Sequence, residues 1–399
     1  MANQVNAPRG MRDFLPGEAS IRQDLISKIS NSYFSRGFQS IETPLLEDLD
    51  RLLSGQGGDN EKLVFKVQKR GEELERAIAQ GEELADLGLR FDLTVPLTRY
   101  YASNQSKLPR VFKAMQIGPV FRAERPQKGR YRQFMQCDID IIGDDSVSAE
   151  AELVTASLAA LQSIGLNGAT IRINHRDLLR SNIEALGIAD SDALAAMVVI
   201  DKLDKIGIEG VAGELGELFG MGVADKAASW LKELDAREFP ELLRPLVEAV
   251  GGSAEYLRFD PTLVRGMGYY TGTIFEIEHP DASSSIGGGG RYDGMVGKWL
   301  GKDVPAVGIS LGFERIADLL GESSASSQFE VLVYEAELLA TAIRLQGELV
   351  AKGRAIRIEK KPKNLKVLLD DMSAAGANQF AILSEEITNI ESLEFKPLS

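Results

Sequence analysis

The amino-acid sequence predicts a mixed α/β (α+β) fold, in which helices flank an antiparallel sheet and a helical insertion and a small C-terminal α/β domain are added. Residues 118–143 form two alternating runs around a break that contains Pro126 and Gly129, which is typical of an antiparallel hairpin with a long loop. Residues 177–255 have a helical pattern throughout, with breaks at glycines. Residues 329–399 alternate strand, helix, strand, helix and strand, which predicts a mostly parallel sheet.

The composition indicates a soluble protein of two or three domains. Its 399 residues exceed a typical single domain, and 44% of them are apolar against 26% charged, which is enough to form sizeable cores. The single cysteine, Cys137, excludes a disulfide framework and a cysteine-based zinc site. No apolar run approaches the roughly 20 residues that span a membrane, and the N-terminus lacks a signal-peptide pattern. We therefore expect a cytoplasmic protein with no membrane association.

Basic residues are concentrated in two short segments. The net charge is −14, which argues against a protein that is positive over its whole surface. The predicted hairpin loop at 125–132 nevertheless carries several basic residues and no acidic one, and residues 352–366 are almost as basic. Because local patches decide contacts with polyanions, these segments favour phosphates or nucleic acid.

The N-terminal region begins with simple elements. An amphipathic helix is expected around residues 17–36, followed by a short strand over 38–43 that Pro44 stops. Residues 68–87 are dense in charge, which predicts a solvent-exposed segment on the surface.

Residues 89–96 alternate apolar and polar side chains. This pattern predicts a strand whose polar set, including Asp92 and Thr94, lies on one face. An edge strand with a wet face would show the same alternation. A carboxylate beside a hydroxyl also supplies the two acceptors that an ammonium group needs.

The second run of the predicted hairpin places Phe134, Gln136, Asp138 and Asp140 on one face, because side chains alternate along a strand. An ordinary buried face would carry aliphatic side chains instead. We therefore interpret this face as either solvated or the floor of a binding site.

The next segment contains one of the two histidines. An alanine-rich helix is expected over residues 146–165, and a strand over 170–174 precedes His175. A solvated strand end explains His175 adequately, and two histidines so far apart form no plausible metal site or triad. No metal site is therefore expected.

Three further motifs carry candidate chemistry. Residues 263–276 combine Arg265 with a pair of tyrosines, for which core packing is the simple alternative. Residues 287–293 begin with four glycines, which would let strand backbone approach a substrate closely. Residues 306–316 read as a strand that runs into a helix carrying Arg315.

These motifs together resemble a known family. Residues 121–134 are similar to the second signature motif of class II aminoacyl-tRNA synthetases, in the form found in histidyl-tRNA synthetases. Residues 37–48 and 306–316 resemble the first and third class II motifs. Residues 263–276 and 287–293 resemble two signatures that are specific to histidyl-tRNA synthetases.

The resemblance implies an ATP site. Arg122 would grip the α-phosphate and the substrate carboxylate, with Glu124 as its partner, and adenine would stack on Phe134. Arg315 would cap the adenine and reach the γ-phosphate, and Arg130 would also contact ATP. Arg265 would approach the α-phosphate, so that the expected catalytic residues are Arg122, Arg265 and Arg315, acting on ATP with Mg²⁺.

The resemblance also implies a histidine site. Asp92 and Thr94 would hold the amino group, and a deep carboxylate such as Asp140 would accept a hydrogen bond from the imidazole N–H. The expected histidine-binding residues are Asp92, Leu93, Thr94, Arg122, Gln136, Asp140, Arg265, Tyr269 and Tyr270. Gly268 departs from the family pattern, which commonly has aspartate there and so a buttress for the arginine.

The same resemblance implies a domain plan and partners. The expected parts are a catalytic domain in two pieces (1–172 and 256–320), a helical insertion domain (173–255), a serine-rich linker (321–328) and a shortened anticodon-binding-like domain (329–399). The expected activity is histidine–tRNA ligation, with histidine, ATP and tRNA(His) as substrates and a homodimer as the assembly.

Two other functions fit parts of the pattern. A synthetase-like regulatory subunit of ATP phosphoribosyltransferase usually lacks the C-terminal domain and the signature arginine, so Arg265 and residues 329–399 argue against it. A catalytically inactive nucleic-acid-binding protein would have lost an arginine or a pocket carboxylate, and this sequence keeps them.

Overall fold

The computed structural model describes residues 5–53, 62–126, 129–234, 238–265, 269–321 and 329–398. Gly268, and all of the expected linker except Gly321, lie outside these described residues. The chain divides into two compact units, one made of residues 1–12 and 26–319 and the other of residues 13–25 and 320–399. Each unit is described by itself below. The expected bounds of the three domains and of the linker stay a prediction.

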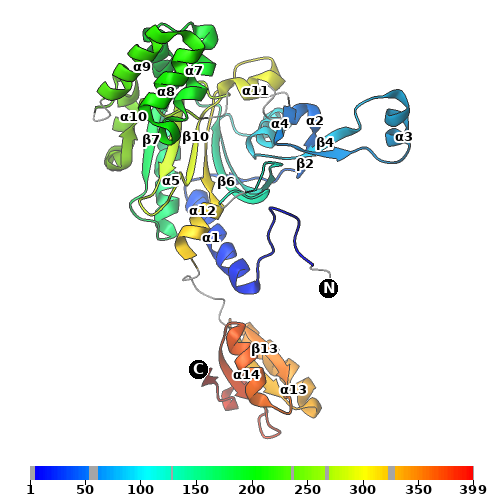
Figure 1. The fold of residues 1–399 in the computed structure, drawn as a ribbon. Coiled ribbons are helices and arrows are strands. Elements are labelled where there is room, and N and C mark those ends of the chain that lie inside the picture. The colour runs from blue at the N-terminus through cyan, green and yellow to red at the C-terminus, as the bar shows by residue number, and fades with distance from the viewer. Residues whose placement is uncertain are drawn as a thin grey trace. The chain divides into compact units, whose positions relative to one another are not determined.

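The larger unit is built on a sheet of eight described strands in the order β1-β5-β6-β11-β10-β9-β7-β8 (Figure 1). From β5 to β7 every neighbouring pair is antiparallel, and the short strands β1 and β8 join in parallel at the two edges. The strands are β1 (Gln39–Ser40), β5 (Phe112–Phe121), β6 (Gln133–Ile142), β7 (Thr170–His175), β8 (Leu257–Phe259), β9 (Thr273–Glu278), β10 (Gly287–Arg291) and β11 (Ala306–Gly312). The predicted antiparallel sheet and its hairpin, β5–β6, are confirmed.

Helix α5 (Val147–Ser163) covers the face of this sheet that carries Cys137 and Ile139. Two ion pairs fix it there, Lys113 with Glu152 at 2.5 Å and Arg291 with Glu150 at 2.6 Å. The opposite face therefore carries Phe134, Gln136, Asp138 and Asp140, because side chains alternate along β6. We call it the polar face.

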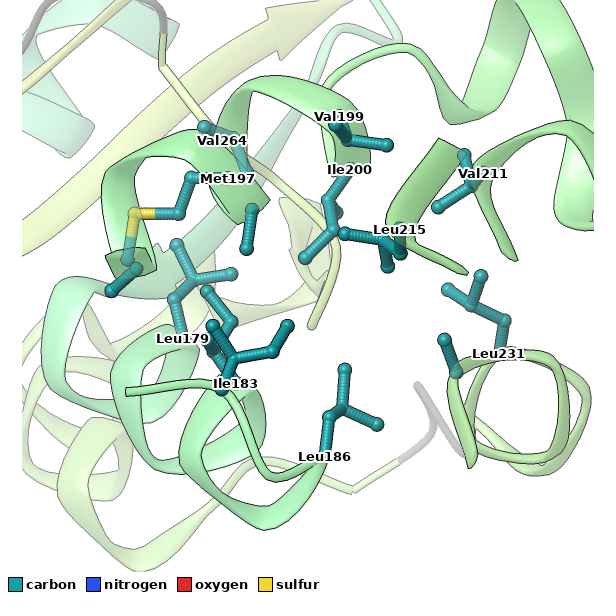
Figure 2. Packing of buried hydrophobic residues seen from close by; sticks show 14 of the residues in the cluster. Leu179, Ile183, Leu186, Met197, Val199, Ile200, Val211, Leu215, Leu231 and Val264 are labelled. Atoms are coloured by element: carbon teal, nitrogen blue, oxygen red, sulfur yellow. The ribbon is translucent and has the colours of Figure 1, made fainter. Parts of the chain in front are cut away.

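A helical group packs at the β7 side of this sheet, where Figure 1 shows α7, α8, α9 and α10 together. Its helices are α6 (Arg176–Ala185), α7 (Ala193–Ile200), α8 (Leu203–Phe219), α9 (Met221–Glu233) and α10 (Arg244–Ala249). Helices α6 to α9 share an apolar core around Leu179, Ile183, Ile200 and Leu215, and Figure 2 shows Val264 among these side chains, whereas α10 contacts α5. Since Val264 belongs to the loop before β9, the helical core anchors that loop.

The N-terminal part contributes a small second sheet in the order β2-β4-β3. Its strands are β2 (Leu46–Asp48), β3 (Phe65–Gln68) and β4 (Ala85–Leu89), and the helices nearby in sequence are α1 (Pro16–Phe34), α2 (Leu49–Leu53), α3 (Gly71–Gln80) and α4 (Thr94–Asn104). Helices α11 (Asp293–Leu300) and α12 (Phe313–Leu320) flank β11 in sequence. Where the sequence predicted a strand over residues 38–43, the structure has the shorter strand β1, which covers two residues.

The expected strand over residues 89–96 is wrong. Strand β4 ends at Leu89 and helix α4 begins at Thr94. The Asp92 carboxylate accepts the backbone N–H of Val95 at 3.0 Å, which caps the start of the helix. Pro96 suits this first turn, because a proline there gives up no helical hydrogen bond. Local capping thus outweighed the alternating pattern.

The smaller unit has a four-stranded sheet in the order β13-β12-β14-β15. Strands β12 (Phe329–Tyr334), β13 (Ile356–Lys360) and β14 (Ala377–Ile382) are parallel, and β15 (Lys396–Pro397) is antiparallel to β14. Helices α13 (Leu339–Ala351) and α14 (Leu365–Ala374) pack in separate clusters with alternate residues of β12, so they cover opposite faces. The predicted small C-terminal α/β domain is confirmed.

Candidate functional site

The register of the large sheet brings polar side chains into rows on the polar face. One row joins Gln116, Asp138, Ser310, Gly288, Glu276 and Arg172, which are successive partners on β5, β6, β11, β10, β9 and β7. The neighbouring row on the same face contains Asp140, Gly308 and Gly290. Gly288 therefore stands between Asp138 and Glu276 in the first row, and Gly308 and Gly290 follow Asp140 in the second. These glycines leave space above the sheet for other side chains.

A cavity of about 400 Å³ opens on this face. It brings together the three arginines that were predicted to be catalytic, Arg122, Arg265 and Arg315. Four other predicted residues also line it, namely Glu124, Arg130, Phe134 and Gln136. All the residues predicted to bind ATP thus share one cavity, although they come from the β5–β6 loop, β6, the loop before β9, and α12.

The cavity is strongly positive. The pKa of Arg315 is lowered by burial and by the charges of Arg130 and Arg265, with a smaller contribution from Arg122. Each of the other three guanidinium groups is therefore close enough to Arg315 to repel its charge. Such a concentration of fixed positive charge, in a protein of net charge −14, favours a polyphosphate over a neutral ligand.

An aromatic surface lies next to these charges. The Arg122 guanidinium carbon is 5.1 Å from the centre of the Phe134 ring, and Arg122 Nε donates a hydrogen bond to the Phe91 carbonyl oxygen at 3.1 Å. Arg315 Nη1 donates a hydrogen bond to the Ser285 carbonyl oxygen. A ring that lines a cavity of arginines offers a flat base the stacking surface that nucleotides use.

Arg265 is held by a residue that sequence reasoning missed. Its Nη1 atom is 2.9 Å from Oε2 of Glu276 on β9. The guanidinium crosses over Gly288, where an added Cβ would lie 2.7 Å from Nη1. Glu276 thus supports Arg265 in place of the aspartate that the family commonly has where this chain has Gly268. Its position in the 263–276 motif was the available signal.

The remaining residues predicted to bind histidine form a buried cluster that does not line the cavity. Asp140 is 4% exposed and accepts a hydrogen bond from the Tyr292 hydroxyl at 2.6 Å. The Tyr269 ring lies edge-on to both Tyr292 and Tyr270, with centroid distances of 6.1 and 4.7 Å. Gly308 makes room for this carboxylate, since a Cβ there would lie 1.9 Å from Asp140 Oδ1.

Tyr292 was not predicted as a site residue, although it lies two residues after the glycine run. Asp92 and Thr94 join the same cluster from the start of α4 instead of from a strand. Thr94 bonds to the Tyr269 hydroxyl, which lowers the pKa of that phenol against the larger effect of burial. Leu93 contributes its carbonyl oxygen, which accepts a hydrogen bond from Gln116 at 3.3 Å.

Several buried polar atoms of this region have no hydrogen-bond partner among the residues that the structure describes. They are Oδ2 of Asp92, Oε1 of Gln136, Oδ1 of Asp138 and Nε of Arg265. Buried polar groups are normally satisfied, because an unpaired one costs about 1–3 kcal/mol. Three oxygens and one N–H that are left open, on β6, before α4 and in the loop before β9, point to a polar ligand with both donors and acceptors.

The N-terminal segment also reaches the cavity, which the sequence analysis did not anticipate. Arg12 forms an ion pair with Glu314 and donates a hydrogen bond to the Tyr131 hydroxyl at 3.0 Å. The Gly10 carbonyl oxygen accepts the N–H of Arg132 at 2.7 Å. Since Tyr131 and Glu314 line the cavity, this segment restrains the loop between β5 and β6.

The buried Asp140 should make stability depend on pH. Burial raises the pKa of Asp140 to about 7, and the Tyr292 hydrogen bond lowers it only in part. A carboxylate in the unfolded chain titrates near 4, so the folded state holds the extra proton between these values. The free energy of unfolding should therefore fall as pH rises from about 4 through 7, by as much as about 4 kcal/mol for this group.

Urea denaturation of the wild type and of Asp140→Asn across this pH range measures the effect. The difference between the two unfolding free energies should change steadily from pH 4 to 8, because asparagine does not titrate. Parallel curves would contradict the role given to this carboxylate.

Two further structural findings concern metal ions and membranes. Among the described residues, no group of three or more His, Cys, Asp or Glu side chains is arranged to hold a metal ion. None of the described helices is both long enough and apolar enough to cross a bilayer.

Comparison with known sequences gives a consistent picture. A model of the histidyl-tRNA synthetase family matches residues 10–316. A histidine–tRNA ligase from Leifsonia xyli subsp. xyli is 47% identical over 434 aligned residues that cover 100% of both proteins. Another from Christiangramia forsetii is 36% identical and covers 81% of this chain and 78% of its own length.

Solved structures agree with these sequence matches. A crystal structure of histidyl-tRNA synthetase from Nostoc sp. PCC 7120 has a TM-score of 0.80 at 26% identity, over 99% of this chain and 95% of that one. A structure described as an ATP phosphoribosyltransferase regulatory subunit/histidyl-tRNA synthetase from Bacillus halodurans has a TM-score of 0.76 at 22% identity, over 96% and 100% of the two chains, which is a likeness of fold alone. The family match over most of the sequence confirms what the motifs predicted, and the chain belongs to the histidyl-tRNA synthetase family.

Proposed function

We propose that this protein is a histidine–tRNA ligase. It activates histidine with ATP to give histidyl-adenylate and pyrophosphate, and then transfers the histidyl group to the 3′ end of tRNA(His). The observation that carries the proposal is the shared cavity of Arg122, Arg265 and Arg315, which adjoins a buried carboxylate, Asp140.

The first step needs positioning and charge neutralisation rather than a protein nucleophile. The histidine carboxylate attacks the α-phosphorus of ATP, a new O–P bond forms, and the bond to the pyrophosphate oxygen breaks. Arg122 and Arg265 neutralise charge on the α-phosphate and Arg315 neutralises charge on the γ-phosphate, while adenine stacks on Phe134. Guanidinium groups suit this role, because they stay protonated throughout.

Selection of histidine rests on the buried cluster. Asp140 accepts a hydrogen bond from an imidazole N–H, and the Tyr292 hydroxyl fixes the orientation of its carboxylate. A leucine or phenylalanine side chain would leave this carboxylate unpaired, and such a loss costs far more than a missing methylene group. Tyr269 and Tyr270 provide the aromatic walls.

The amino group of histidine has its own acceptors. Asp92 and Thr94 hold it from the start of α4, with Leu93 between them, and Gln136 approaches from β6. The unpaired oxygens of Asp92 and Gln136 support this assignment.

Magnesium enters with the nucleotide rather than as a resident ion. Mg²⁺ usually keeps several waters and binds through substrate phosphates and one or two carboxylates. Glu124 lines the cavity, and its carboxylate would provide such a contact to the ion. Bound with the nucleotide, the ion would supply positive charge that offsets the charge of the phosphates.

Further assignments complete the proposal. The helical group around α7 and α8 and the C-terminal α/β unit contact tRNA(His), and the protein acts as a cytoplasmic homodimer. The domain bounds are those predicted from the sequence, with the insertion at 173–255 and the C-terminal domain at 329–399.

Pyrophosphate exchange tests the proposal most directly. Each of the twenty amino acids is supplied in turn with magnesium-ATP and labelled pyrophosphate, and label should enter ATP with histidine alone. Exchange driven by another amino acid would overturn the substrate, and no exchange with any of them would overturn the activity.

The regulatory-subunit alternative is less well supported. The ligase that is 47% identical to this chain matches it along its whole length, and Arg265 is present. Charging of tRNA, rather than stimulation of a phosphoribosyltransferase, is the expected outcome when both assays are run on one preparation.

A further inference from the structure

We propose that Arg172 on β7 is a positioning residue for Arg265, acting through Glu276. The proposal rests on the role assigned above to Arg265 at the α-phosphate. It goes beyond that role, because it identifies a residue remote from the nucleotide that keeps the arginine both in place and available.

The two arginines share one carboxylate. Glu276 pairs through Oε2 with Arg265 Nη1 at 2.9 Å and through Oε1 with Arg172 Nη2 at 3.4 Å. Arg172 and Glu276 are direct partners across β7 and β9, so the sheet itself fixes their separation. The side chains of all three are only 20–23% exposed, which limits screening by solvent.

Arg172 also fixes the start of the loop that carries Arg265. Its Nε atom is 2.9 Å from Oδ2 of Asp260. The other oxygen of Asp260 accepts the N–H and the hydroxyl of Thr262 at 2.8 and 2.7 Å, and the Asp260 N–H donates to the Ile173 carbonyl oxygen at 3.0 Å. One guanidinium therefore joins the beginning of the loop to the carboxylate that holds its functional side chain.

The backbone next to Arg265 is anchored separately. Leu263 and Val264 are 2% and 7% exposed and belong to the core of the helical group, where Figure 2 shows Val264 close to Met197. The Leu263 carbonyl oxygen accepts a hydrogen bond from Asn174 at 3.2 Å. With the main chain held in this way, the direction of the Arg265 side chain depends on Glu276 and on what neutralises Glu276.

Charge balance explains why a second arginine is needed. Arg265 faces Glu276, and it also lowers the pKa of Asp201 at the end of α7, a group whose pKa burial and Glu276 raise. If Arg265 were the sole cation near these carboxylates, its positive charge would mainly neutralise them. Arg172 forms ion pairs with Oε1 of Glu276, with Asp260 and, at 2.9 Å, with Glu278. The positive charge of Arg265 is then available to a phosphate.

The test is a double-mutant cycle on histidine-dependent pyrophosphate exchange, with Arg172→Met, Arg265→Ala and the double variant. Methionine keeps an unbranched apolar stem, although a shorter one, and removes the charged guanidinium group. We expect Arg172→Met to lower kcat by about 10-fold with little change in the KM for histidine, and to cause no further loss when Arg265 is already alanine.

Arg258→Met is the matched control. Arg258 is the neighbour of Arg172 in register on β8, but among the described residues its Nη1 donates only to the backbone carbonyl oxygens of Glu255 and Leu257. It should keep the wild-type kcat. If Arg172→Met does not fold, Arg172→Lys replaces it, because lysine keeps the charge but cannot contact Asp260 and Glu276 together with a planar fork.

The outcomes separate this inference from the proposed function. Losses that multiply in the double variant, or an equal loss in Arg258→Met, would show a general structural effect and overturn the inference. Nitrogen-15 arginine spectra of the wild type and Arg172→Met add a readout that needs no activity. A shifted Arg265 Nε–H resonance, assigned by its loss in Arg265→Ala, supports the inference, and an unchanged one overturns it, even if exchange fails with every amino acid and the proposed function falls.

Discussion

Replacement of Arg265 with alanine is expected to slow histidine-dependent pyrophosphate exchange by about 10²- to 10³-fold, the usual cost of removing one preorganised donor from a developing charge. The guanidinium lines the cavity together with Arg122 and Arg315, and Glu276 holds it at 2.9 Å. Negative charge increases on the α-phosphate as the carboxylate attacks. The loss should therefore appear mainly in kcat, with a smaller change in the KM for ATP.

Arg258→Ala serves as the control for this measurement, because Arg258 is an arginine of the same sheet whose side chain is exposed and lies outside the cavity. Arg265→Lys adds a graded test, since lysine restores the charge without the two-pronged geometry and should recover only part of the rate. An Arg265→Ala enzyme as fast as the wild type would remove this residue from the mechanism.

Much of the site could be predicted from sequence because side chains alternate along a strand. The positions of Phe134, Gln136, Asp138 and Asp140 on one face follow from parity alone, and β6 has this arrangement. The sequence motifs also placed Arg122, Arg265 and Arg315 together, although no local pattern joins residues so far apart. That part of the prediction came from the resemblance, and the cavity agrees with it.

Other features escaped prediction for physical reasons. The run around Asp92 alternates like a strand, yet one side-chain hydrogen bond to Val95 and a proline in the first turn begin a helix there. The contact between Arg265 and Glu276 depends on the register of β9 with β10, and the contact of Glu276 with Arg172 depends on β7. Register between strands distant in sequence is set by tertiary packing, so a single sequence does not reveal it.

The structural role of the glycine run over residues 287–290 could be predicted only in part. From the sequence, these glycines were expected to let the backbone approach a substrate. In the structure, the space beside Gly288 and Gly290 is taken by side chains of the site itself, Arg265 and Tyr270, in addition to the backbone of β9. The need for glycine was therefore predictable, whereas the groups that fill the space were not.

Gly289→Ala should be the most destabilising change in this run, with a loss of about 3 kcal/mol in the free energy of unfolding. A Cβ at Gly289 would lie 1.9 Å from the Gly308 carbonyl oxygen and 2.7 Å from the Ile309 Cα. Both atoms belong to the backbone of β11, which is hydrogen-bonded on both sides and cannot rotate away as a side chain can. The two central strands would have to separate.

Gly294→Ala, five residues later in α11, provides a matched control. An added Cβ there meets no atom within 4 Å, and alanine favours a helix over glycine by up to about 1 kcal/mol. Urea denaturation should therefore give a lower midpoint for Gly289→Ala and an unchanged or higher one for Gly294→Ala. Because β10 also carries the space for Arg265, Gly289→Ala should lose exchange activity along with stability. A Gly289→Ala protein that unfolds at the wild-type midpoint would mean that β10 and β11 tolerate a wider spacing, and the argument that close strand packing requires these glycines would be wrong.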